Sequence, residues 1–294
     1  MLAALQRARS VLLGLLGLAV LAAVWDLYKA FGPDDGVRVG DRLLVLPRAS
    51  DLAMPHTWEV VQRLGEPVTS LPGAGSTLGA VVDASLFTLA IATRGFVIGV
   101  VVGLVLALLM SRVRIVESAL LPWIVLSQTV PLIALAPLVK RWGSEFDRLG
   151  YIWTNEQSVA VIAAYLAFFP VAVGALRGLK SAEATHLDLM RAYGLGWWRT
   201  LFTLRLPSSV PFLLPALRLG AASAVIGTVV AEVSIGLRGG IGRMIIEYAQ
   251  SASSDPAKPW APILGAVAVG LVAAGVVGLI GLLLRPYRTA EATR

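Results

Sequence analysis

Six apolar stretches, almost free of charged residues, constrain the fold of this chain more than any other feature of its sequence. They cover residues 11–25, 86–111, 118–139, 157–176, 212–235 and 259–284. A helix that crosses a membrane needs roughly 20 mostly apolar residues. Only 15% of the residues are charged, whereas a soluble domain carries about 25%. The sequence therefore predicts an all-α, polytopic membrane bundle of about six transmembrane helices and excludes an ordinary soluble enzyme.

The first stretch has two interpretations. Arg7 and Arg9 precede it, as basic residues precede the apolar core of a secretory signal peptide. However, Val24 and Trp25 follow the small residues Ala22 and Ala23, so no convincing cleavage site precedes a polar segment. We favour a retained transmembrane helix.

The basic residues predict how the chain is oriented. With the N-terminus inside, the segments 1–9, 112–117, 177–207 and 285–294 hold 12 basic and 4 acidic residues. The outer segments hold 11 basic and 13 acidic residues. Because cytoplasmic loops are enriched in Lys and Arg, both termini are expected in the cytoplasm. The net charge of +7 is thus explained by membrane orientation and gives no support to nucleic-acid binding.

Small residues and prolines suggest how the helices pack. Gly95, Gly99 and Gly103 recur at a spacing of four, which predicts a close helix–helix contact, although so many glycines could produce the run by chance. Pro131 and Pro137 interrupt the third stretch and remove backbone donors. They predict either a pathway lining or ordinary kinks.

Glu232 is the one acidic residue inside the six apolar stretches. A charge deep in lipid costs about 2.5–3.5 kcal/mol, so it should face protein, water or the interface. We considered a pathway or gate residue near the outer face, and a structural ion pair with a nearby cation such as Arg238.

The basic loop 177–207 carries the most informative pattern. Ser181 is a candidate helix cap, with Glu183 in the first turn, and Gly194 and Gly196 are candidate stop signals. Leu206 and Pro207 then open the next apolar segment. This predicts a short exposed helix between two spans, suited to contact a partner, or alternatively a solvated loop.

This loop resembles that of the permease subunits of bacterial ABC importers, in particular the nitrate/sulfonate/taurine group. Those loops have the form E-A-A-x-x-x-G followed, after nine intervening residues, by I-x-L-P. The matching positions, with Asp188 in place of the glutamate, are Asp188, Gly194, Leu204, Leu206 and Pro207, and Trp198 stands where such loops often have tryptophan. Further similar stretches cover 130–138, 168–170 and 226–232, so that the resemblance spans roughly residues 46–285.

The resemblance implies the type I ABC importer permease fold, with three kinds of partner. Two ATP-binding subunits would receive the coupling loop 177–207, a second permease copy would complete a homodimer, and an extracytoplasmic solute-binding protein would deliver the solute. The chain has no G-x-x-x-x-G-K-[ST] phosphate-binding motif. It is therefore expected to hold no cofactor, with ATP and Mg²⁺ bound by the partner.

The resulting hypothesis is a non-enzymatic permease subunit in a bacterial cytoplasmic (inner) membrane. Residues 1–80 would form an N-terminal transmembrane helix and outer segment, 81–285 the permease core, and 286–294 a cytoplasmic tail. The solute would be a small anion such as a sulfonate, nitrate or taurine-like compound, or a vitamin precursor. The alternative is a secondary transporter or channel without an ATPase partner.

Overall fold

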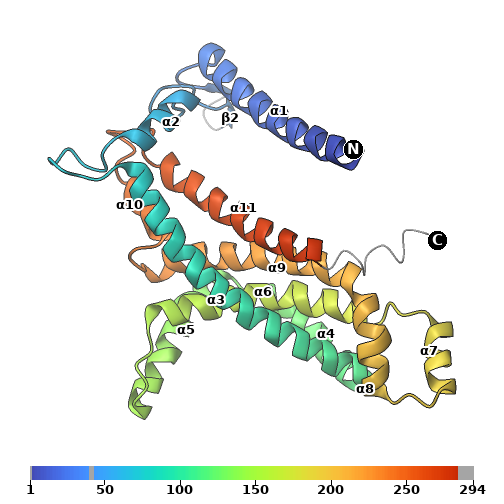
Figure 1. Ribbon diagram of the computed structural model, residues 1–294. Helices are drawn as coiled ribbons and strands as arrows, with labels where there is room; N and C mark the ends of the chain where they lie inside the picture. The colour runs from blue at the N-terminus through green and yellow to red at the C-terminus, as the bar shows by residue number, and fades with distance from the viewer. Residues whose placement is uncertain (1, 40–42, 284–294) are drawn as a thin grey trace. The chain divides into compact units, whose positions relative to one another are not determined.

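The computed structural model describes residues 2–39 and 43–283, and the proposed tail 286–294 lies outside the described residues. Nearly all of the described chain is helical (Figure 1). The helices are α1 (Leu2–Phe31), α2 (Thr57–Gly65), α3 (Thr77–Arg112), α4 (Arg114–Ser127), α5 (Leu132–Ser144), α6 (Asn155–Leu179), α7 (Ala184–Ala192), α8 (Trp197–Thr200), α9 (Leu206–Ile235), α10 (Ile241–Ala249) and α11 (Trp260–Leu283). A 3₁₀ turn, η1 (Glu145–Leu149), follows α5, and a π turn, η2 (Leu201–Arg205), joins α8 to α9.

The chain divides into two compact units. Unit 1 holds residues up to 82 together with 245–264, and unit 2 holds 83–244 together with the chain from 265 onward. Unit 1 contains α1, α2 and the antiparallel strands β1 (Val37–Val39) and β2 (Leu43–Leu46), paired through Val37 with Leu46 and Val39 with Leu43. Unit 2 contains most of the long helices.

Polar contacts in unit 1 hold the end of α1 to the segment that follows it. The Trp25 indole donates to the Pro55 carbonyl at 2.9 Å, and the Lys29 ammonium lies 2.6 Å from Asp51. This ammonium holds the pKa of the Asp51 carboxyl below its usual value by hydrogen bonding to it. The apolar surface of α1 before these contacts stays exposed within the chain.

Five described helical segments are long and apolar enough to cross a membrane, in agreement with five of the six predicted spans. The third predicted span, 118–139, is not one straight helix. It is the pair α4 and α5, bent by 106°. Pro131 stands directly before α5, and a proline both lacks an N–H and disfavours helical geometry at the residue before it.

Side chains satisfy backbone carbonyls around this bend. The Ser127 hydroxyl donates to Ile124 O at 2.7 Å and the Thr129 hydroxyl to Leu126 O at 2.8 Å. The Tyr165 hydroxyl of α6 donates to Ser127 O. Broken backbone at membrane depth is tolerated where such partners replace the lost helical bonds.

Within unit 2, α3 and α6 run parallel in close contact. A Cβ added at Gly99 would lie 2.7 Å from the Ala167 Cβ and 2.8 Å from Ala164 O. The same holds one helical turn away in each direction, at Gly95 and Gly103, which face successive turns of α6. The predicted run of glycines thus faces α6 along its length, where backbones pack without side chains between them.

Helix α9 runs antiparallel to α6. Gly178 near the end of α6 faces Ser209 near the start of α9, while Gly227 near the end of α9 faces Ala163. Because α3 and α6 point the same way, the bent pair α4–α5 must return the chain across the bundle, and it counts as one crossing. Figure 1 shows α3, α6 and α9 packed side by side.

Candidate functional site

One end of unit 2, which we call the loop end, is where α3 and α6 finish and α9 starts, at Arg112, Leu179 and Leu206. The predicted loop 177–207 lies here. It contains α7, α8 and η2, and Figure 1 shows α7 standing apart from the long helices. None of the residues of α7, all of which the structure describes, is buried.

Gly194 ends α7 through a left-handed turn. Its φ is +68°, its N–H donates to Arg191 O at 2.9 Å, and the N–H of Leu195 donates to Met190 O at 3.0 Å. These two bonds form a Schellman motif, which favours glycine because a Cβ is unfavourable at positive φ. Gly196, by contrast, has a φ of −69° and precedes α8, so it begins a helix instead of stopping one.

The start of α7 differs from the sequence prediction. Glu183, not Ser181, is the residue before the helix, and its side chain makes no capping bond. The Ser181 hydroxyl lies 2.7 Å from Gly178 O and 3.1 Å from Ser208 O. Ser181 therefore ties the end of α6 to the start of α9, because its hydroxyl lies close to one carbonyl from each helix.

The predicted coupling residues lie along this loop with different surroundings. Asp188 is exposed on α7 and lies 2.9 Å from Arg191. Trp198 is 59% exposed on α8, and Tyr193, at the end of α7, is 73% exposed. Leu204 is half-buried in η2, and Leu206 and Pro207 are half-buried at the start of α9. The α7–α8 surface is thus rich in apolar side chains that stay exposed within the described part of the chain.

Contacts that sequence analysis missed fix the loop to the helices beside it. Lys180 forms an ion pair with Glu117 of α4, and the Arg112 guanidinium lies 4.9 Å from the Trp197 ring and 5.7 Å from the Trp198 ring. Arg112 and Glu117 flank the break between α3 and α4. These contacts join the loop to the end of α3 and to the first turn of α4.

Glu232 lies at the opposite end of α9 and is completely buried. Its carboxylate accepts from the Thr88 hydroxyl at 2.8 Å and from the Gly242 N–H at 2.8 Å, and Thr88 in turn accepts from the Ile241 N–H at 2.9 Å. The anticipated pairing with Arg238 is not among the ion pairs of the described residues. The carboxylate instead binds the first turn of α10, where the helix dipole favours an anion.

Two of the glycines in the 236–242 segment, Gly240 and Gly242, lie against this carboxylate. A Cβ at Gly240 would collide with the Glu232 carboxylate, and a Cβ at Gly242 would lie 2.9 Å from the Glu232 Cβ. These two glycines therefore leave room for a carboxylate supplied by the chain itself. The two predicted proline positions lie elsewhere: Pro131 directly precedes α5, Pro137 lies within α5, and both are exposed.

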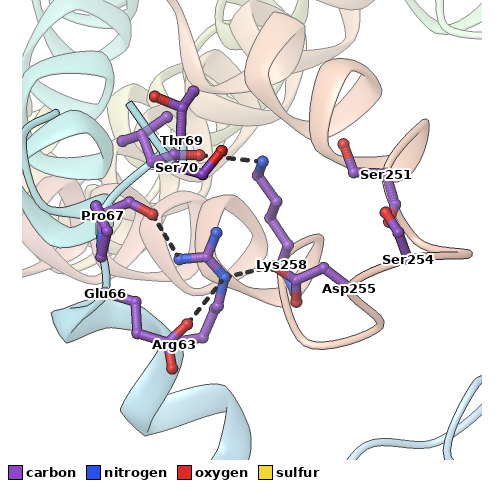
Figure 2. A pocket seen from close by; sticks show the side chains of 10 residues that line it. Arg63, Glu66, Pro67, Thr69, Ser70, Ser251, Ser254, Asp255 and Lys258 are labelled. Atoms are coloured by element: carbon purple, nitrogen blue, oxygen red, sulfur yellow. Dashed lines mark hydrogen bonds and ion pairs between the residues drawn. The ribbon is translucent and has the colours of Figure 1, made fainter. Parts of the chain in front are cut away.

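A polar pocket of about 470 Å³ lies within unit 1 (Figure 2). Its buried Arg63 side chain lies 2.6 Å from Asp255, donates to Pro67 O at 3.1 Å and to Thr77 Oγ1 at 2.8 Å. Lys258 reaches Val68 O at 3.2 Å. Carboxylates that line the pocket already neutralise the positive charge of Arg63. The contacts therefore form a structural clamp between the 63–77 segment and the segment before α11.

We expect replacement of Asp255 by asparagine to destabilise unit 1. The substitution removes the negative charge that faces the buried Arg63 guanidinium, so a charge-assisted hydrogen bond becomes a weaker bond to a neutral amide oxygen, at a cost of about 1 kcal/mol. The expected result is a lower unfolding temperature in detergent. The matched control is Glu145→Gln, whose carboxylate belongs to an exposed pair with Arg148. Equal stability of the two variants would contradict the clamp.

The sequence of this chain is similar to a known protein family and to known transport proteins. The family described as "binding-protein-dependent transport system inner membrane component" matches residues 99–287. The formylaminopyrimidine transport permease protein ThiX of Halalkalibacterium halodurans is 32% identical over 247 residues, covering 80% of this chain and 92% of that protein. The putative aliphatic sulfonates transport permease protein SsuC of Bacillus subtilis is 29% identical over 68% of each chain.

A solved structure supports the fold. A chain from the crystal structure of an amino acid ABC transporter with histidines superposes with a TM-score of 0.52 at 18% identity. The match covers 70% of this chain and 92% of that one. At this identity the likeness concerns the arrangement of the helices.

Proposed function

Because the chain belongs to the family of binding-protein-dependent transport system inner membrane components, and is thus a membrane-spanning permease subunit of an ABC transporter, we propose that its loop 177–207 docks into an ATP-binding subunit. Permeases of this family work with an ATP-binding subunit and a substrate-binding protein, and are not themselves enzymes. The proposal assigns the first of these contacts to α7 and α8.

The exposure of α7 carries this proposal. A helix of nine residues in which none is buried gains little stability from its own chain, because short isolated helices are marginal in water. Leu189 on α7 and Trp198 on α8 nevertheless expose apolar surface. An exposed apolar patch of this kind suits a protein partner. Asp188 and Gly194 would set the charge and the turn of the docking surface.

The complete assembly would contain two copies of this chain and two ATP-binding subunits. ATP and Mg²⁺ would be held by those subunits, because the phosphate-binding motif is missing from this sequence. Both termini would lie in the cytoplasm of a bacterial cell, and a solute-binding protein would act from the other side. The excess of Lys and Arg in the segments at the loop end supports this orientation.

The transported solute would be a small organic or inorganic anion, or a vitamin-precursor-like heterocycle. Support comes from the names of two relatives, one for formylaminopyrimidine and one for aliphatic sulfonates. Pro131, Pro137 and the exposed face of α5 would contribute to the pathway. A thermal-shift screen of the cognate binding protein against sulfonates and pyrimidines distinguishes the two classes.

A Gly194→Val substitution tests the coupling contact. Valine is unfavourable at the φ of +68°, so the turn after α7 should be lost and the docking surface displaced. We expect at least a tenfold loss of affinity for the ATP-binding subunit and a similar loss of ATP-linked uptake in proteoliposomes.

The matched control is Gly196→Ala, because Gly196 has a negative φ and open space around its Cα. Control and wild type should couple equally. Uptake by the Gly194→Val variant at the wild-type rate would overturn the assignment of the loop. Solute uptake without any ATP-binding subunit would favour the alternative, a secondary transporter or channel.

A further inference from the structure

The loop and the long helix α9 are joined by an unusual turn. Residues Trp197–Ile235 form one continuous helical segment, but Leu201–Arg205 within it is a π turn. The Leu206 N–H donates to Leu201 O, one residue further back than in an α-helix. A π turn therefore holds one extra residue, and such turns are rare and frequent at functional sites.

Pro207 explains why the turn is wide. In a regular α-helix the N–H at position 207 would bond Thr203 O, but proline has no N–H and its ring presses on that carbonyl. Pro211, four residues later, leaves Pro207 O without its helical donor for the same reason. A wider turn before Pro207 relieves the crowding.

The extra residue decides which side chains are buried. Ser209 faces the packed side of α9 and is 3% exposed. In an unbroken α-helix, residues 202 and 198 would share that face, since side chains recur every 3.6 residues. In the structure Leu201 is 2% exposed instead, while Phe202 is 65% exposed. The π turn thus shifts the packed face by one residue.

The sequence is compatible with two helical registers. In the observed register Leu201 is packed, and in a register shifted by one residue Phe202 would be packed. Trp197 and Trp198 are adjacent, as are Leu201 and Phe202, so each register offers one tryptophan and one large apolar side chain. Here Leu201 and Trp197 pack on the cluster formed by α3, α4 and α6. A one-residue slip would replace them by Phe202 and Trp198, with little change in the kind of surface buried.

Arg205 adds a cost to the observed register. Its Nε is buried without a hydrogen-bond partner, and its Nη1 reaches Leu179 O only at 3.4 Å. An unsatisfied buried donor destabilises the state that contains it. The π turn therefore relieves the crowding at Pro207, while the Arg205 Nε stays unsatisfied in this state.

We propose that the π turn Leu201–Arg205 is a register switch that couples the α7–α8 loop to α9. In one state Leu201 is packed and the turn is π-helical. In the other the turn becomes α-helical, Phe202 takes the packed position, and α8 rotates by about 100° and moves by about 1.5 Å relative to α9. The inference rests on the proposed function, because the ATP-binding subunit would drive the slip.

A Phe202→Lys substitution tests the switch in the full transporter. Lysine is tolerated at an exposed position of the π register, but in the α register it would be placed in an apolar cluster. We expect the transporter to assemble and, when the amount of bound ATP-binding subunit is matched to wild type, ATP-linked uptake to fall at least tenfold. Phe202→Leu, which suits both registers, should transport normally. Normal uptake by Phe202→Lys would overturn the switch.

Thiol labelling measures the slip directly, because the chain contains no cysteine. Without nucleotide, the thiol of a Phe202→Cys variant should react rapidly and that of Leu201→Cys slowly. With a hydrolysis-resistant ATP analogue on the partner, the Phe202→Cys thiol should become protected at least fivefold. Unchanged labelling in a variant with normal uptake contradicts the switch, while loss of coupling in Gly194→Val would still support the proposed function.

Discussion

Replacing Gly99 by valine is expected to prevent stable packing of α3 on α6. A Cβ at this position would lie 2.8 Å from Ala164 O and 2.7 Å from the Ala167 Cβ, and a backbone carbonyl inside a helix cannot move aside. Overpacking costs about 1–3 kcal/mol, and more where the backbone itself is displaced. We expect an unfolding temperature lowered by on the order of 10 °C, or no folded protein.

The control for this prediction is Gly270→Val in α11. Gly270 lies within an apolar helix too, but a Cβ there meets no atom within 4 Å. Both variants add the same side chain to a membrane-spanning helix, so differences in insertion are matched. Thermal unfolding in detergent, followed by size-exclusion chromatography, compares them. Similar unfolding temperatures would show that the glycine contact does not hold α3 to α6.

Replacing Glu232 by alanine is expected to release the first turn of α10. The substitution leaves the Thr88 hydroxyl and the Gly242 N–H without their acceptor in a fully buried site. Each buried donor left without an acceptor costs about 1–3 kcal/mol, and the lost side-chain volume adds a cavity. Thermal unfolding should therefore shift by on the order of 10 °C.

A second measurement separates this local effect from general instability. Met244 in α10 is buried, so the thiol of a Met244→Cys variant should be protected from a water-soluble maleimide. Adding Glu232→Ala should expose that thiol, whereas adding Glu232→Gln, which keeps an acceptor oxygen, should expose it less. Thr88→Val should act like Glu232→Ala, and Thr88→Ser should act like wild type. Equal protection in all variants would contradict the anchoring role of Glu232.

The membrane spans were predictable because span length and apolarity are local properties of the sequence. A stretch such as 157–176 must be helical in lipid, whatever its neighbours are, since every backbone polar group has to be satisfied internally. The break at Pro131 was foreseeable as an interruption. Its angle was not, because it depends on how Tyr165 and the neighbouring hydroxyls satisfy the freed carbonyls.

The partners of Glu232 were not predictable. Sequence analysis looked for a cation close in the chain, at Arg238, while the hydroxyl that binds the carboxylate belongs to Thr88, which is 144 residues away. The one available signal was the nearby cluster of glycines, Gly240 and Gly242 among them. A cluster of glycines leaves room for a group but does not say which group fills it.

The sequence by itself determined that this chain is a helical membrane protein, where its spans lie, and which loop matches the coupling loop of ABC permeases, because hydrophobic length and motif spacing are linear properties. The tertiary structure alone decided which residues that loop presents. Leu201 and Phe202 are equally apolar, so composition cannot choose between them. The π turn before Pro207 makes that choice, since it is set by the missing N–H of one proline and the packing of three helices around it.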